Sequence, residues 1–316
     1  MIEGLAITPP VLGRISIGKV VEKNGKRLPE KDDAFTVTSL VQQREGWVNH
    51  PLDAVLRKSA ADTKLRAIPV RVLFADPHLS FRAEYTAFNR VNGRPVCSGD
   101  GRTCKRRTPE GLTTLPCPTP QDCAFGEVNG CKPYGRLNVQ IEGQDDDLGS
   151  FIFRTTGYNS IRTLSARLAY YQALAGHALP CLPLTLKLRA KSTTQSHRSA
   201  VYFVDLVVRD GMTLEDALRQ ARQALQERCE AGWDQEALDK AAAAGLANGA
   251  FEDGEEEGAA VVEEFFQTDV SPGSAGGEVA AASSLGAKLA AKASPGGTLA
   301  DTPTEPADDP AVALTR

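Results

Sequence analysis

Five of the seven cysteines lie in one 35-residue window, at Cys97, Cys104, Cys117, Cys123 and Cys131. They are separated by six, twelve, five and seven residues, among many glycines and prolines. Zn²⁺ prefers about four such ligands in a tetrahedron, and loops of this composition let the backbone wrap around the ion. No pair has the two-residue separation of a zinc knuckle, so the density of thiols carries the prediction. We expect a structural zinc ion that orders a segment without apolar runs of its own.

Four of these five thiols would complete the site. Cys117, Cys123 and Cys131 share one loop, and Cys97 closes a strand-like approach, so these four are the expected Zn²⁺ ligands. Cys104 lies among basic residues in "RTCKRR" and is the expected spare thiol, able to act as a substitute. Four thiolates leave no position for water, which makes the predicted zinc structural rather than catalytic. The alternative is a group of unliganded thiols.

The other polar motifs do not form a catalytic set. The four histidines are widely spread, and none has the spacing of a metalloprotease helix. Asp145, Asp146 and Asp147 could hold a divalent cation, but a solvated hairpin tip is the simpler interpretation. The segment "SGDGRTCK" lacks the spacing of a phosphate-binding loop. We therefore predict that the protein is not an enzyme.

Basic and aromatic residues surround the cysteine window. The side chains that could contact nucleic-acid phosphates are Lys105, Arg106, Arg107, Lys132 and Arg136. Phe125 and Tyr134 could anchor a protein partner or stack on bases. Two simpler alternatives stay open: a solvated basic rim around the metal, and a Tyr134 that packs in the core.

Charge and composition divide the chain of 316 residues, whose net charge is −4, into two parts. Residues 244–316 carry 13 acidic and 3 basic residues, a net charge of −10, so residues 1–243 carry +6. We predict a body over 1–243, with the zinc loop at about 97–131 as an insertion, and a disordered acidic tail rich in Ala, Gly and Pro over 244–316. Within the tail, "EEEGAAVVEEFFQ" could fold onto a partner. A basic body fits nucleic acid or an acidic protein surface.

The body is expected to be α+β, with mainly antiparallel strands and two amphipathic helices. Alternating or apolar runs around polar turns predict three strand pairs: 67–74 with 79–88, 134–142 with 149–157, and 182–191 with 199–208. Apolar residues at helical spacing predict helices over 159–176 and 213–233. The second opens with Thr213 three residues before Asp216, close to a capping box. Cys181 and Cys229 are interpreted as ordinary core or surface residues.

No membrane or secretion segment is expected. "MIEGLAITPP" is too short and too broken by proline for a signal peptide, and no stretch approaches the roughly 18 apolar residues that span a bilayer. We therefore expect a protein of the reducing cytoplasm with no membrane partner, where clustered cysteines bind metal more often than they form disulfides.

Three segments together resemble a known family. They are "GRISIGKVVEKNGKRLPEKDDAFTVTS", "CPTPQDCAFGEVNGCKPYGRLNV" and "FRTTGYNSIRTL" with the later "LPLTLKLRAK". They are similar to the recombination directionality factors that partner the large serine integrases of phages and integrative elements, often described only as metal-binding. The likeness covers roughly residues 12 to 210. In that pattern the second thiol of the first pair is commonly absent, which supports Cys104 as the spare. The acidic tail departs from the family.

The resemblance implies a non-enzymatic, zinc-binding regulator of site-specific DNA recombination in the cytoplasm of a bacterial host cell. Its partner would be a large serine integrase, itself bound to DNA, which the protein redirects from integration to excision. The alternative is a nucleic-acid-binding accessory protein of a phage or integrative element. Salt-dependent binding of DNA would favour the accessory protein, and capture of an integrase without DNA would favour the regulator.

Overall fold

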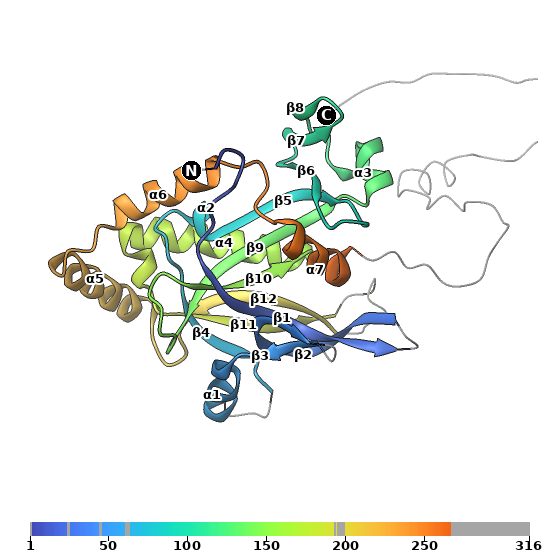
Figure 1. Ribbon diagram of the computed structural model, residues 1–316. Helices are drawn as coiled ribbons and strands as arrows, with labels where there is room; N and C mark the ends of the chain where they lie inside the picture. Colours follow the sequence, from blue (N-terminus) through green and yellow to red (C-terminus); the bar gives the residue numbers. More distant parts are fainter. Residues whose placement is uncertain are drawn as a thin grey trace, which may run out of the picture. The chain divides into compact units, whose positions relative to one another are not determined.

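A large, mainly antiparallel sheet dominates the fold (Figure 1). The computed structural model describes residues 2–23, 26–43, 46–60, 64–192, 194 and 200–266. Within this part, the strands follow the order β3-β2-β1-β10-β9-β5-β6-β7-β8, and β4 pairs with both β9 and β11, which pairs with β12. The strands are β1 Val11–Lys23, β2 Lys26–Gln43, β3 Gly46–Asn49, β4 Ala67–Arg71, β5 Phe81–Phe88, β6 Pro95–Gly99, β7 Thr103–Thr108, β8 Gly111–Pro116, β9 Lys132–Ile141, β10 Ser150–Thr155, β11 Leu184–Lys191 and β12 Val201–Val208. Among these described strands, only β1 and β10 pair in parallel.

The helices cover parts of this sheet and connect its branches. They are α1 Pro51–Ser59, α2 Pro77–Ser80, α3 Ala124–Asn129, α4 Tyr158–Ala175, α5 Leu214–Glu230, α6 Gln235–Ala247 and α7 Glu255–Phe265, with 3₁₀ turns η1 Pro120–Asp122 and η2 Gly176–Cys181. The main core lies where α4 packs on the sheet, and Leu164, Leu168 and Tyr171 form the buried stripe of this helix. No helix in the described ranges is long and apolar enough to cross a membrane.

Local sequence signals account for the two predicted helices. In α5, the Thr213 hydroxyl accepts a hydrogen bond from the Asp216 N–H at 3.1 Å and donates one to the Asp216 carboxylate at 2.7 Å. This cap satisfies an otherwise unpaired N–H group of the first turn. The helices predicted over 159–176 and 213–233 are therefore confirmed as α4 and α5. Cys181 is buried in the core and Cys229 is exposed on α5, as their interpretation requires.

Two of the three predicted strand pairs are confirmed, namely β9 with β10 and β11 with β12. The pairing of 67–74 with 79–88 is wrong. Asp76 caps the short helix α2 between these segments, so the chain does not turn back on itself. Instead, β4 lies between β11 and β9, where Ile68 and Val70 are fully buried in the main core.

The cysteine window is more regular than its composition indicates. Instead of an irregular loop, it forms a meander of β6, β7 and β8 that extends one end of the sheet, followed by α3. The predicted tail also differs at its start. Residues 244–247 complete α6, and α7 packs on the body through Val261 and Phe266. Residues 267–316 lie outside the described part of the chain, and the compact unit runs from Met1 to Thr268.

Candidate functional site

The five clustered cysteines come from five consecutive elements. Cys97 lies in β6, Cys104 in β7 and Cys117 directly after β8. Cys123 caps the N-terminus of α3, and Cys131 directly precedes β9. The antiparallel register places Cys97 opposite Arg106 and Gly99 opposite Cys104. Arg106 of β7 contacts Cys123 at the start of α3, and Cys117 and Cys131 pack against Cys97 and Cys104, so thiols from both halves of the window come together.

The thiols form a small cluster, and burial keeps two of them, Cys104 and Cys131, protonated. Cys97 and Cys104 are buried beside Ala87, and Cys117, Cys131 and Phe125 pack against them. Burial, with a further contribution from the neighbouring thiols, raises the pKa of Cys131 to about 12. Burial and the nearby Cys97 thiol raise the pKa of Cys104 to about 11. Without a metal ion, these two side chains are neutral at physiological pH.

Cys123 differs because donors point at its sulfur. Its Sγ accepts a hydrogen bond from the Gly126 N–H at 3.3 Å, and the Arg106 guanidinium lies 3.7 Å away. Among the described residues, however, no three Cys, His, Asp or Glu side chains are arranged so that they could hold a metal ion. The cluster has suitable ligand chemistry for zinc, and the zinc site stays a prediction.

The predicted nucleic-acid contacts separate into two groups, of which the first lies on β7. Lys105 and Arg107 are exposed. Arg107 also donates a hydrogen bond to the Pro95 carbonyl at 3.2 Å and lies 5.0 Å from the centre of the Phe251 ring. Arg106 is half-buried and lies over the Phe125 ring at 4.1 Å. β7 therefore presents positive charge to solvent at this end of the sheet.

Arg136 belongs to the second group and does not reach solvent. Only 3 % of it is exposed, and its guanidinium forms ion pairs with Glu84 at 2.6 Å and with Asp253 at 3.2 Å. Although burial disfavours its charge, Glu252, Asp253 and Glu84 raise the pKa of Arg136 above its ordinary value. A phosphate cannot contact this side chain while the segment containing Glu252 and Asp253 covers it, which corrects its predicted role.

Lys132 and Tyr134 are covered by the same segment. Lys132 donates a hydrogen bond to the Phe265 carbonyl and lies over the Phe266 ring at 4.7 Å. Tyr134 is fully buried, with ring centres of Phe88 and Phe266 at 5.6 and 6.0 Å. In this arrangement Tyr134 packs in the core, as the simpler interpretation has it, and its role as a partner-binding anchor stays a prediction. Phe125 is half-buried and keeps a solvent-facing edge.

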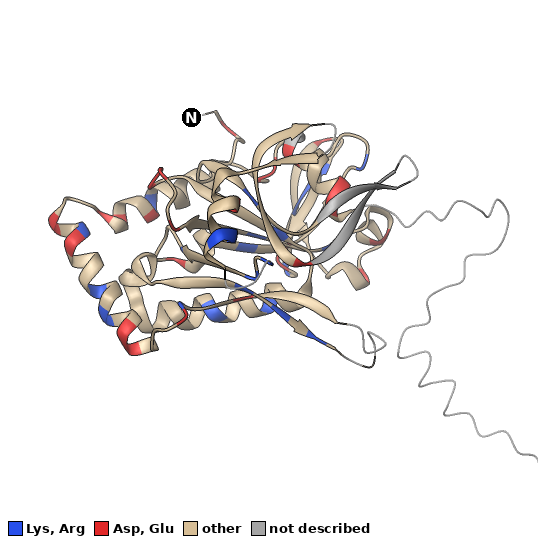
Figure 2. Ribbon diagram, turned by 90° about the horizontal axis from the view of Figure 1, so that it is seen from below, with Lys and Arg blue, Asp and Glu red and all other residues tan. Residues whose placement is uncertain are grey.

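The sequence did not predict that an acidic segment near residue 260 covers a group of basic residues on the sheet. We define the acidic segment as residues 251–266 and the basic face as the strand residues Arg14, Arg82, Lys132, Arg136 and Arg154. These residues lie on β1, β5, β9 and β10, and Figure 2 shows basic positions along the central strands. The available signal was an arginine inside an otherwise apolar strand, as in "GRISIG", "LSFRAEY" and "FIFRTTG".

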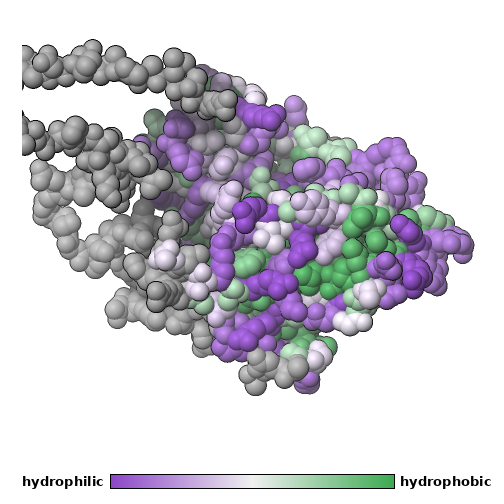
Figure 3. Space-filling view, turned by 180° about the vertical axis from the view of Figure 1, so that it is seen from behind, coloured by the Kyte–Doolittle hydropathy of each residue, from purple (hydrophilic) through white to green (hydrophobic). Residues whose placement is uncertain are grey.

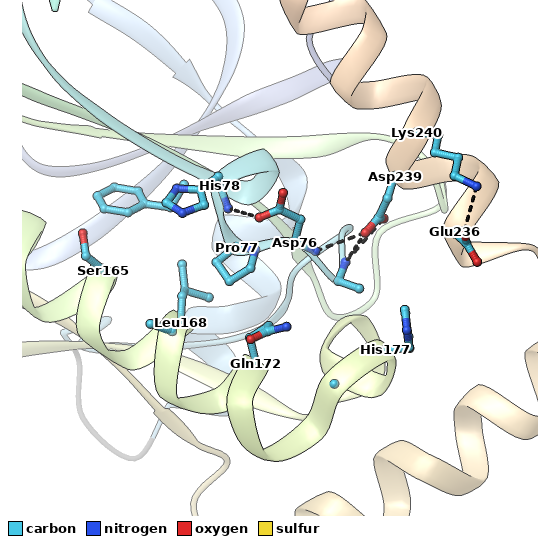
Figure 4. A pocket seen from close by; sticks show the side chains of 14 residues that line it. Asp76, Pro77, His78, Ser165, Leu168, Gln172, His177, Glu236, Asp239 and Lys240 are labelled. Atoms are coloured by element: carbon cyan, nitrogen blue, oxygen red, sulfur yellow. Dashed lines mark hydrogen bonds and ion pairs between the residues drawn. The ribbon is translucent and has the colours of Figure 1, made fainter. Parts of the chain in front are cut away.

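A cavity of about 510 Å³ lies between α2, α4 and α6 (Figure 4). Two of its carboxylates bind backbone: Asp239 accepts the N–H groups of Ala75 and Asp76 at 3.0 and 3.1 Å, and Asp76 caps the N–H of His78 at 2.8 Å. The third, Glu236, pairs with Lys240 at 2.7 Å. His78 and His177 point from opposite sides of the cavity and do not converge. This lining therefore pairs no base with a nucleophile.

The rest of the surface carries scattered apolar side chains. Seen from behind, the described surface is mainly hydrophilic, with one larger and several smaller groups of hydrophobic residues (Figure 3). Tyr158, Tyr170 and Leu174 of α4 are among the exposed large apolar residues. Single exposed side chains of this kind are normal on soluble domains and define no site.

The described residues form a mainly antiparallel α+β body with an edge meander and a covered basic face. Comparison with known families then places it. The family model Gp3-like, described as recombination directionality factor-like, matches residues 12–209, and the chain belongs to this family. The family consists generally of non-catalytic regulators of site-specific recombination, whose general partner is an integrase. No curated protein and no solved structure matches the chain.

Proposed function

We propose that this protein binds a large serine integrase and redirects it from integration to excision. The observation that carries the proposal is the family match over residues 12–209, which spans the whole sheet, α4 and the cysteine meander. A regulator of this kind shifts the equilibrium between two integrase conformations only through its differential affinity for them. It therefore needs a rigid surface, and a single connected sheet supplies one.

The edge meander with α3 is the exposed part of the matched region that best suits this role. β7, β8 and α3 lie together at one end of the molecule (Figure 1). Phe125 lies on α3 beneath the Arg106 guanidinium, which holds the ring in place. Aromatic and arginine side chains often dominate interface energy, and truncation of one commonly costs about 2 kcal/mol.

A recombination assay tests the proposal directly. A large serine integrase encoded beside this gene is incubated with plasmids carrying either its integration or its excision sites, with and without this protein. We expect excision only when the protein is present, together with inhibition of integration. Phe125→Ala should weaken integrase capture about 30-fold, the equivalent of about 2 kcal/mol. The control is Val55→Ala on α1, an apolar residue that is 60 % exposed and lies outside the meander and α3. If the ratio of excision to integration products is the same with and without this protein for every integrase encoded near its gene, the proposal is contradicted.

A nucleic-acid-binding accessory protein is the second candidate. The exposed Lys105 and Arg107 favour it, because alternate residues of β7 point to the same face of the strand. Binding of this type weakens steeply with salt, since each neutralised phosphate releases counterions. Mobility shifts of duplex DNA that vanish in Lys105→Ala, Arg107→Ala, in the absence of integrase, would support this candidate over the first.

We also propose that the cysteine cluster binds one structural zinc through Cys97, Cys117, Cys123 and Cys131. Support comes from the packing of these thiols around Phe125 and from the donors that point at Cys123. Protein purified without chelator should contain about one zinc per chain by elemental analysis. Cys123→Ser should lose it, whereas Cys104→Ser and the exposed control Cys229→Ser should keep it. Metal-free wild-type protein from zinc-supplemented cells would refute the site.

A further inference from the structure

The basic face and its cover have different origins within the chain. Every residue of the basic face lies inside the matched range 12–209, while the acidic segment lies outside it. The acidic segment contains seven acidic residues and no basic ones. A surface that belongs to the family fold is thus covered by a segment that does not belong to the matched region.

Ion pairs join the acidic segment to the basic face. Asp253 pairs with both Arg136 and Arg154 at 3.2 Å, and Glu252 pairs with Arg136 at 3.3 Å and with Arg82. Glu264 pairs with Arg14. Burial raises the pKa of Glu264 although Arg14 opposes the shift, which shows that desolvation offsets part of this attraction.

The acidic segment leaves several donors of the basic face unused. Within the described residues, Arg82 Nη2, Arg136 Nε and Arg154 Nε are buried and have no hydrogen-bond partner. The Asn138 Nδ2 amide is in the same state, and these side chains line a cavity of about 10 Å³, room for about one water molecule. A water molecule in this cavity can satisfy some of these donors, and a ligand richer in acceptors can satisfy more of them, because each unpaired buried donor is costly.

Apolar anchors specify the shape of that ligand. Val261 and Phe266 of the acidic segment are buried against Phe88 and Tyr134, and one helical turn separates successive contacts. At the start of α7, Gly258 lies so close to the 89–94 turn that a Cβ atom there would overlap the Gly93 carbonyl oxygen. The surface covered by α7 thus fits a helix with a small residue at its point of closest approach, apolar side chains below and carboxylates at its sides.

We propose that the basic face is a binding surface for an acidic, amphipathic helix of a partner protein, and that the acidic segment occupies this surface until such a helix displaces it. The apolar seat formed by Phe88 and Tyr134 favours a peptide helix over nucleic acid, whose backbone offers no aliphatic side chains. A partner competes with a tethered ligand whose effective concentration is on the order of millimolar. The covered state therefore sets a threshold for binding. The identification of the partner as an integrase rests on the proposed function. The proposal that the basic face binds an acidic helix does not depend on it.

A matched pair of glycine variants of the full chain tests this inference. Gly258→Ala should release the acidic segment, because the added methyl group overlaps Gly93, while alanine leaves the free helix more stable. Gly254→Ala is the control, since a Cβ atom there meets nothing within 4 Å. The probe is a fluorescent peptide of residues 250–266. We expect Gly258→Ala to bind it at least about tenfold more tightly than wild type or Gly254→Ala, as loss of the tethered competitor requires. A peptide with Val261→Asp and Phe266→Ala should not bind.

Hydrogen exchange of the backbone amides of residues 255–265 measures how often α7 leaves the body. Faster exchange there than in β9 for wild type, and faster still in Gly258→Ala, supports displacement. Exchange as slow as in β9, or global unfolding of Gly258→Ala, would make α7 a permanent part of the core and overturn the proposal. A released segment without peptide binding would also overturn it, and so would binding of an oligonucleotide in place of the peptide. Because the probe comes from this chain, these outcomes do not depend on whether any integrase binds.

Discussion

Tyr134 is the residue on which β9 and the acidic segment meet. Its ring packs against Phe88, Phe265 and Phe266, and its hydroxyl lies 3.4 Å from the Asp253 carboxylate. Tyr134→Ala would leave a large cavity among these rings, so we expect a loss of about 3–5 kcal/mol in the free energy of unfolding. Phe125→Ala removes a half-buried ring and should cost about 1 kcal/mol. Urea unfolding followed by circular dichroism measures both, and equal losses would show that Tyr134 is not a core residue.

Asp205 provides a titratable contribution to stability. It is buried in β12, and it accepts hydrogen bonds from Arg167 at 3.0 Å and from Arg189 at 2.6 Å. Burial disfavours its charge, but the two guanidinium groups outweigh this effect and hold the pKa of Asp205 below its ordinary range. A carboxyl with a depressed pKa stabilises the fold above its unfolded pKa and loses that contribution as the pH falls through its folded pKa.

The depressed pKa of Asp205 predicts how its substitution changes stability with pH. Asp205→Asn should lower the free energy of unfolding by about 1–2 kcal/mol at pH 7, a modest value because both arginines are partly exposed to solvent. The difference between variant and wild type should shrink towards about pH 3. Denaturant titrations at the two pH values measure it, and a difference that is constant with pH would mean that the Asp205 charge is not responsible.

Among the elements, α5 shows how much a local cap contributes. Its fully buried residues are Ala217 and Ala221, and Leu218, Ala224 and Leu225 pack partly buried against the main core. The Thr213 cap adds to this packing at the first turn. Thr213→Ala should cost about 1 kcal/mol of stability, while Thr213→Ser, which keeps the hydroxyl, should cost much less. Hydrogen exchange of the first turn of α5 is the sensitive measurement. Equal protection in both variants would exclude the hydroxyl as the source.

The elements that could be predicted from sequence are those specified by local pattern. The stripe of Leu164, Leu168 and Tyr171 and the Thr213 cap identify α4 and α5, and polar turns identify the β9–β10 and β11–β12 hairpins. β4 could not be placed, because its partners are strands far along the chain and only burial of Ile68 and Val70 decides between them. α7 could not be placed either, since its composition alone resembles that of a disordered acidic tail.

The candidate site was harder to predict for a related reason. The clustering of the cysteines is visible in the sequence, but the meander that carries them is not, because β6–β8 are short and poor in apolar residues. The basic face draws Arg14, Arg82 and Arg154 from strands that only the sheet brings together. No spacing in the sequence reports this proximity, so single arginines within apolar strands were the sole indication.

At the scale of the whole molecule, two truncations distinguish the compact unit from the rest of the chain. Ending the chain after Thr268 removes none of the described packing, and the melting temperature should change little. Ending it after residue 243 removes α7 and the last turn of α6, including Leu246, which packs on Leu73, Phe74 and Leu79. We expect that truncation to lower the melting temperature by roughly 5 °C or more, equivalent to about 2 kcal/mol. Identical melting curves for the two truncations would return the boundary to residue 243.

The parallel pairing of β1 with β10 has a consequence for the order of events on the ribosome. Val11 pairs with Ser150, and the residues between them include β2 to β9. Translation produces β1 and β2 long before β10. The edge of β1 that pairs with β10 therefore stays unpaired until a large part of the chain has been made. The acidic segment follows later still. During biosynthesis the arginines of β1, β5, β9 and β10 therefore assemble first in an open nascent domain, and their cover arrives only afterwards.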